Sequence, residues 1–220
     1  SPLALLDSLP NAFVGSRRTM YMFQPAIGSF YEGIQYGHKE LLSARDPWSG
    51  YIHYDPVLYM LSHITKFAKT GWENDTNTNG IWRVLPNATY GSFGSSDNEH
   101  QTAGINGDAS YMTLAAPDKT NFSTVFINNT QNEKTFAIKT SDLNLSVDAL
   151  HIWTTVTDDY LKQGEDVKIE DGIAYVTVPA YSVVTATTLD TTPERFPTED
   201  GSGDYIQTEK RTVLDTDYTG

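Results

Sequence analysis

The hydrophobic pattern of the chain changes near residue 80, and this change is the strongest constraint on its fold. From residue 80 to residue 189, apolar and polar residues alternate in short runs, which is typical of strands with one buried face. Turn-forming pairs such as Asn79-Gly80, Asn106-Gly107 and Asp171-Gly172 separate the runs. The pattern predicts an antiparallel β-sandwich with strands at 81–85, 111–115, 123–127, 135–138, 150–156, 173–178 and 182–189.

The region before residue 80 predicts one strand, one long loop and one helix. Residues 19–23 are β-forming residues with little alternation, as in a strand that is buried on both faces. Residues 24–54 have no helical period and several glycines, and loops of this length are usually functional. Residues 56–69 begin with a proline and place apolar residues on one helical face. A shorter apolar run at 3–9 could form a helical turn that Pro10 ends.

The charge of the chain is unevenly distributed. Residues 1–72 hold six Lys and Arg and five Asp and Glu. Residues 73–220 hold nine Lys and Arg and twenty-three Asp and Glu, and the net charge of the whole chain is −13. The shift indicates a domain boundary near Trp72, and residues 191–220 are typical of an acidic linker or tail. So acidic a chain is a poor partner for nucleic acid or anionic membranes.

Two further features of composition bear on function. The chain has no cysteine, which excludes disulfides and thiolate chemistry, and no histidine has metal-like spacing with carboxylates. We therefore expect no metal and no cofactor. No stretch is apolar for long enough to span a bilayer.

Five Asn-x-Ser/Thr sequons follow residue 72, more than the composition predicts by chance. They favour N-glycosylation, and hence a secreted, extracellular or lysosome- or vacuole-like location, at Asn74, Asn87, Asn121, Asn128 and Asn144.

Residues 30–37 read Phe-Tyr-Glu-Gly-Ile-Gln-Tyr-Gly, and residues 46–51 read Asp-Pro-Trp-Ser-Gly-Tyr. Ser-His-Ile-Thr-Lys-Phe at 62–67 and Gly-Trp at 71–72 follow at matching spacing. This ordered set resembles glycoside hydrolase family 59, the galactocerebrosidase-like family, densely over residues 11–73 and more weakly to residue 189. The resemblance implies a retaining hydrolase of β-galactosides with a (β/α)8 barrel and a β-sandwich.

Together, pattern and resemblance predict an α/β plus all-β chain, the final βα unit of a (β/α)8 TIM barrel followed by an antiparallel β-sandwich. The barrel segment would cover residues 1–73, the β-sandwich 79–190 and the acidic linker or tail 191–220. By the resemblance, residues 20–30 would be the eighth barrel strand and residues 56–69 the eighth helix.

The resemblance also bears on the catalytic groups. A retaining glycosidase needs two carboxyl groups about 5 Å apart, and in this family they are glutamates on the fourth and seventh barrel strands. The chain starts after the seventh strand by this alignment. We therefore expect no catalytic residue in this chain, and a partner in an N-terminal barrel segment or chain of the same enzyme.

The loop after the eighth strand would supply the rim of the site. Tyr36 matches a family tyrosine that faces the nucleophile and the sugar, and Trp48, His38 and Gln24 are further candidate substrate-binding residues. Tyr36 and Trp48 could instead be packing residues. Glu32 is interpreted as an ion-pair partner rather than a nucleophile.

Three positions refine this interpretation. His63, on the expected helix, is interpreted as a buried histidine with its hydrogen bonds satisfied. Gln24 stands where animal members of the family have a sugar-facing Trp. Residues 128–134 contain no Arg where those members place one at the active site, and Lys134 is the only nearby cation. Galactosylceramide is therefore in doubt as the substrate.

Two alternatives remain beside the enzyme. The β-sandwich could be a non-catalytic carbohydrate-binding module, or the chain could be purely structural. The strand, rim loop and helix ahead of the β-sandwich favour the enzyme, because a free β-sandwich module would not need them.

Overall fold

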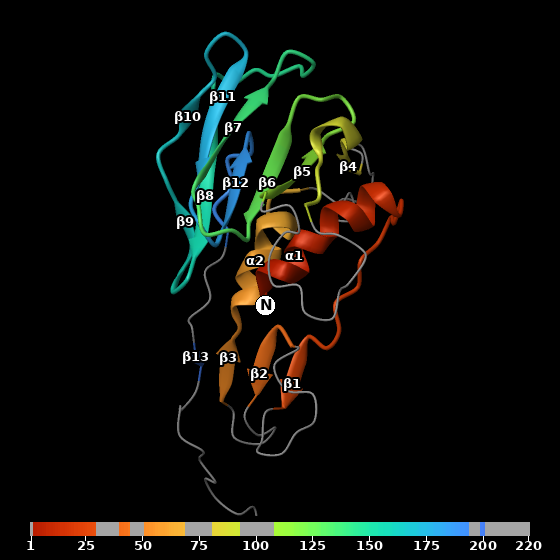
Figure 1. Ribbon diagram of the computed structural model, residues 1–220, viewed down its shortest axis with the longest axis vertical. Helices are drawn as coiled ribbons and strands as arrows, with labels where there is room; N and C mark the ends of the chain where they lie inside the picture. The colour runs from red at the N-terminus through yellow and green to blue at the C-terminus, as the bar shows by residue number, and fades with distance from the viewer. Residues whose placement is uncertain are drawn as a thin grey trace, which may run out of the picture. The chain divides into compact units, whose positions relative to one another are not determined.

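The computed structural model describes residues 2–29, 40–44, 51–68, 81–92, 108–193 and 199–200. The chain divides into two compact units, one of residues 1–21 and 59–195 and one of residues 22–58 and 196–220. The described residues form mostly sheet with few helices (Figure 1). The division does not follow the expected boundary near residue 73, because the first helix and most of the second share a unit with the later strands.

The first unit is built on a seven-stranded antiparallel sheet. Its order is β10-β8-β12-β6-β5-β4, and β9 pairs with β8. The strands are β4 (Arg83–Val84), β5 (Ser110–Ala115), β6 (Phe122–Asn128), β8 (Ala149–Val156), β9 (Asp159–Gln163), β10 (Val167–Lys168) and β12 (Ser182–Thr187).

A second sheet of two strands lies against the first. β7 (Lys134–Lys139) pairs antiparallel with β11 (Ile173–Val178), and Figure 1 shows the pair in front of the larger sheet. One apolar core joins Phe122, Phe126 and Val184 of the larger sheet to Val176 and Val178 of β11. All seven strands expected from the period of two are therefore confirmed, within a few residues at their ends. β9 and β10 were not expected, since they are short and polar.

The central strands β6 and β12 of the larger sheet are buried on both faces, because helices cover the face opposite β7 and β11. Every residue of β12 is buried, and its side chains alternate between the two cores: Val184 belongs to the core shared with β11, whereas Val183 packs with the helices. Helix α1 (Pro2–Pro10) contributes Leu3, Leu6 and Leu9 to the helix side. The spacing of three residues places these leucines on one helical face.

The helices differ slightly from expectation. α1 ends at Pro10 as predicted, but the chain continues in a single π turn, η1 (Asn11–Gly15). α2 (Pro56–Thr65) has the expected proline at its first position and ends four residues before the predicted end at 69. Phe67, beyond the helix, is nevertheless fully buried.

The second unit contains a small sheet of order β1-β2-β3-β13. β1 (Ile27–Ser29) pairs parallel with β2 (Leu42–Ala44), and β3 (Ile52–Tyr54) pairs antiparallel with β2 and with β13 (Glu199–Asp200). Two residues of the expected acidic tail thus form a strand.

The expected buried strand over residues 20–30 is wrong. Only Ile27–Ser29 form a strand, and Met20 and Met22 are 61% and 78% exposed. A strand that is buried on both faces needs hydrogen-bonded neighbours on both sides. Among the described residues no strand pairs with residues 20–25, so β propensity alone does not produce the strand there.

Candidate functional site

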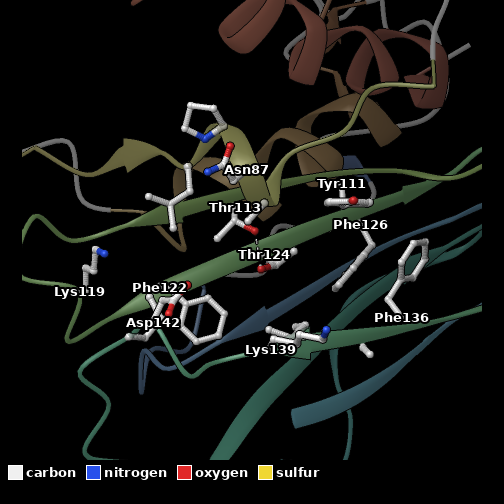
Figure 2. A pocket seen from close by; sticks show the side chains of 16 residues that line it. Asn87, Tyr111, Thr113, Lys119, Phe122, Thr124, Phe126, Phe136, Lys139 and Asp142 are labelled. Carbon is white, nitrogen blue, oxygen red and sulfur yellow. Dashed lines mark hydrogen bonds between the residues drawn. The ribbon is translucent and has the colours of Figure 1, made fainter. Parts of the chain in front are cut away.

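A cavity opens beside β7, over part of the larger sheet. It has a volume of about 490 Å³. One wall is the 3₁₀ turn η2 (Pro86–Ala88), the floor is β5 and β6, and the other wall is β7 with the segment that follows it (Figure 2). We call this cavity the β7 groove. Figure 2 labels ten of its residues: Asn87, Tyr111, Thr113, Lys119, Phe122, Thr124, Phe126, Phe136, Lys139 and Asp142.

Aromatic rings form one end of the β7 groove. Phe136 lies 4.8 Å from Phe126 and 5.7 Å from Tyr111 between ring centroids, the latter pair edge to face. Tyr90 continues the row at 5.9 Å from Tyr111. A second cavity of about 340 Å³ shares Tyr111 and Phe136 with the first and adds Tyr90, Asp108 and Lys134. The side chains of Tyr111 and Phe136 therefore line both cavities.

Polar groups are placed along the same groove. The hydroxyls of Thr113 and Thr124 are hydrogen-bonded across β5 and β6 at 2.8 Å in its floor. Lys119, Lys139 and Asp142 line the groove, and Lys139 is exposed. An aromatic surface beside hydroxyl, amide and ammonium groups can contact both the apolar and the hydroxylated faces of a sugar.

The second unit holds a separate polar cluster around Ser43. Its hydroxyl contacts Glu40 Oε1 at 2.9 Å and Asp55 Oδ2 at 2.6 Å, and both Glu40 and Ser43 are buried. His53 Nε2 lies 3.8 Å from Asp55 Oδ1. A serine hydroxyl has one proton and donates to one carboxylate at a time, so this contact holds two carboxyl groups close to one hydroxyl. The register of β2 and β3 pairs Ser43 with His53 and brings the cluster together.

His63 is a buried structural residue, as expected. It is fully buried, Nδ1 lies 2.8 Å from Thr185 Oγ1, and Nε2 lies 2.7 Å from Thr155 Oγ1. Thr185 Oγ1 donates to the His63 carbonyl oxygen at 3.2 Å, so Nδ1 carries the ring proton and donates to Thr185. Burial lowers the pKa of His63 to about 3, and the ring is therefore neutral.

Most of the predicted rim residues lie outside the described part of the chain. This is the case for Tyr36, Trp48, His38 and Glu32. Gln24 is described and is exposed in the irregular segment before β1. These assignments stay predictions.

The sequons fall into three environments. Asn87 and Asn144 are exposed, Asn121 is half-buried with its Oδ1 accepting from Thr188, and Asn74 lies outside the described residues. Asn128 is fully buried.

Asn128 is bound on all sides. Its Nδ2 contacts the carbonyl oxygens of Asn132, Val178 and Pro179 at 2.9, 3.2 and 2.9 Å, and its Oδ1 accepts from Thr130 Oγ1 at 2.7 Å. A glycan on this nitrogen would break these hydrogen bonds and has no space in the folded unit. The geometry therefore argues against the predicted glycan at Asn128.

The β7 groove was not foreseen from the sequence. The available signal was the alternation in β7, which turns Lys134, Phe136 and Ile138 inward while their neighbours are exposed. Because aromatic residues in a β domain more often fill a core, the pattern could not separate a groove wall from a core position.

Within the described residues, no group of three or more His, Asp or Glu side chains is arranged to hold a metal ion. In the same part of the chain, no helix is long and apolar enough to cross a membrane.

Residues 3–66 are similar in sequence to known glycosidases. This segment matches the sequence model of Glycosyl hydrolase family 59. The chain resembles galactocerebrosidase of Danio rerio, with 32% identity over 60 residues, 27% of this chain and 9% of that protein. Human galactocerebrosidase is 35% identical over 46 residues, 21% of this chain and 7% of that protein. The segment is therefore glycosidase-related. More particularly, it is galactocerebrosidase-like, which confirms the resemblance inferred from the two sequence blocks.

Similarity to solved structures is weaker. The superposition with a conserved exported protein from Bacteroides fragilis covers 86% of this chain and 35% of that protein, with 15% identity and a TM-score of 0.48. A GH30 endoxylanase from Clostridium papyrosolvens covers 61% and 28%, with 13% identity and a TM-score of 0.40. The chain spans less than a tenth of the length of the curated relatives given above.

Proposed function

We propose that this chain is the C-terminal portion of a secreted, retaining glycoside hydrolase that acts on β-galactosides. The observation that carries the proposal is the match of residues 3–66 to family 59, because that segment contains the predicted rim loop. The relatives it resembles are named galactocerebrosidases. In this proposal residues 1–73 complete a (β/α)8 barrel, 79–190 are an antiparallel β-sandwich and 191–220 are a linker or tail.

The catalytic carboxyl groups would come from an N-terminal barrel segment or chain of the same enzyme. Retention needs a nucleophile and an acid/base about 5 Å apart, and we assign neither role to a residue of this chain.

Within the active site, Tyr36 would orient the nucleophilic carboxylate through its hydroxyl, while Trp48, His38 and Gln24 would contact the sugar. Substitution Tyr36→Phe in the complete enzyme removes that hydrogen bond. We expect it to cost about 2–4 kcal/mol of transition-state stabilisation, seen as a lower kcat on an aryl β-galactoside, with little change in Tm.

Tyr175→Phe is the matched control, because Tyr175 is an exposed tyrosine on β11. Its kinetics should equal those of the wild type. A Tyr36→Phe enzyme with unchanged kcat and KM would show that Tyr36 only packs. Hydrolysis of aryl β-glucosides or β-xylosides in preference to the β-galactoside would overturn the substrate assignment while leaving the hydrolase assignment.

A carbohydrate-binding role for the β-sandwich is the second candidate, and the β7 groove favours it. The groove combines an aromatic wall with hydroxyl and amide groups, as saccharide sites do. It requires no catalytic group and is compatible with the enzyme assignment.

A further inference from the structure

We propose that Asn87 carries an N-linked glycan and that the first sugars of this glycan lie in the β7 groove of the same molecule. The inference rests on the secretory location proposed above, and it assigns an occupant to the groove. It does not depend on which glycoside the enzyme hydrolyses.

The attachment point lies on the wall of the groove. Asn87 is in the 3₁₀ turn η2, is exposed, and lines the cavity (Figure 2). It begins the sequon Asn87-Ala88-Thr89. Thr89 Oγ1 donates to the Leu85 carbonyl oxygen at 2.9 Å and accepts from the Thr113 backbone N–H at 3.2 Å. The sequon is thus tied to the groove floor at its third residue, so the position of Asn87 over the groove is set.

The groove has the chemistry that a pyranose needs. A sugar ring has an apolar C–H face, which can stack on Phe136 or Tyr111, and hydroxyl edges, which can contact Thr113, Lys119 or Lys139. The volume of about 490 Å³ lies within the range of roughly 300–1,000 Å³ that is usual for small-molecule sites.

Covalent attachment favours the chain's own glycan over a soluble saccharide. A ligand on a short tether has an effective concentration in the millimolar range, so even a weak site would be filled by it. Sugars on Asn87 would also occupy the mouth of the groove and exclude free saccharide. Because Asn87 itself lies in the wall of the groove, the tethered glycan is the occupant that the geometry supports.

The modification is an ordinary group transfer. Asn87 Nδ2 forms a bond to the anomeric carbon of a lipid-diphosphate-linked oligosaccharide, the bond from that carbon to the diphosphate breaks, and one amide proton is lost with the lipid diphosphate as leaving group. Nδ2 keeps one hydrogen.

The first experiment measures how readily each glycan is released by an amidase that cleaves N-glycans. The complete protein is secreted from a glycosylating eukaryotic host, treated before and after denaturation, and analysed by peptide mass spectrometry. We expect Asn87 to be glycosylated and its glycan to be released at least about tenfold more slowly from the native protein. Asn144 is the matched site, because it is exposed and outside the groove lining, and its Nδ2 bond to the Asp118 carbonyl needs only one hydrogen. Its glycan should be released at similar rates in both states.

The second experiment compares Asn87→Gln with Asn144→Gln. Loss of the groove glycan should expose the aromatic wall, increase the binding of a hydrophobic dye and lower Tm by about 2–4 °C. Asn144→Gln should change neither. If Asn87→Gln is not secreted, the release rates of the wild-type protein decide the matter.

An unmodified Asn87, or a glycan released equally fast from native and denatured protein, would overturn the inference. Because neither readout uses the glycosidase activity of the protein itself, such a result would leave the glycosidase proposal standing. Loss of β-galactosidase activity would in turn leave this inference standing.

Discussion

His63 shows how burial and two neighbouring hydroxyls set the state of a single residue. Both ring nitrogens are hydrogen-bonded to threonines of β8 and β12, and the Thr155 hydroxyl accepts from the Leu161 N–H at 2.9 Å. Thr155 Oγ1 therefore uses its proton to donate to Nε2. The two donations are complementary only in the neutral tautomer with the proton on Nδ1, so a charged ring has no place in this network.

The free energy of unfolding should depend on pH through the titration of His63. The pKa of His63 is about 3 in the folded state against 6.5 for the free side chain, so the unfolded state binds the extra proton. The contribution of His63 is fully present above pH 6.5 and is lost as pH falls toward 3, with a slope of up to about 1.4 kcal/mol per pH unit.

His63→Gln in the complete protein removes this titration. We expect the variant to be about 2 kcal/mol less stable at pH 7, because it loses a buried hydrogen bond and some volume. The difference in the free energy of unfolding between the variant and the wild type should become smaller toward pH 4.5, as measured by urea unfolding. His151→Gln is the control: His151 lies at the surface beside Asp166, so that variant should keep the wild-type slope. An equal deficit of His63→Gln at both pH values would contradict the assignment.

At the scale of elements, the docking of α1 on β5 includes a buried acid. Asp7 of α1 is 1% exposed, and its Oδ1 accepts hydrogen bonds from Ser110 of β5 and from Ser92 at 3.5 Å. Within the described residues its Oδ2 has no hydrogen-bond partner. Burial raises the pKa of Asp7, and the two serine hydrogen bonds oppose this in part.

Asp7→Asn tests this contact. Because the folded pKa is above the unfolded value of 3.8, the unfolded state releases the proton first, and stability declines as pH rises from 3.8 through the folded pKa. We expect Asp7→Asn to be more stable than the wild type at pH 7, by about 1 kcal/mol, with the gain disappearing near pH 3. Thermal unfolding at the two pH values measures it.

Asp118→Asn is the control for Asp7→Asn, because the pKa of Asp118 is shifted in the opposite direction. Asp118 is exposed, and hydrogen bonds from the backbone and side chain of Thr120 lower its pKa. This variant should show no gain at pH 7. A destabilised Asp7→Asn at neutral pH would show that the carboxylate is stabilising in its charged form.

The elements also differ in how far local pattern predicts them. β6 and β12 were expected from their residues and are confirmed, since each pairs with two neighbouring strands of this chain. Residues 19–23 are also β-forming residues, but no strand among the described residues pairs with them, and they form no strand. Pairing rather than propensity decides such a segment.

At the scale of the whole molecule, the proposed barrel makes this chain dependent on an upstream segment. Met20, Met22 and Ile27 are 61%, 78% and 57% exposed, and exposed apolar groups of this kind favour association. We expect residues 1–220 expressed alone to aggregate and to have no activity on an aryl β-galactoside. Co-expression with the upstream segment should give a soluble complex with activity, as measured by size-exclusion chromatography and substrate turnover.

A chain that is monomeric and active alone would refute this expectation. It would then place Glu32 and a second carboxylate of this chain in the catalytic roles. A soluble complex without any glycosidase activity would instead contradict the proposed function.

The period of two after residue 80, the proline before the helix at 56 and the two motif blocks at 30–37 and 46–51 were sufficient to predict the seven strands, the helix and the family resemblance. Each is a local property, because strand and helix periods depend on neighbours a few residues apart. The partners of His63, the burial of Asn128 and the β7 groove could not be predicted in this way. They join residues up to 122 positions apart, and such contacts exist only once the two sheets and the helices have packed.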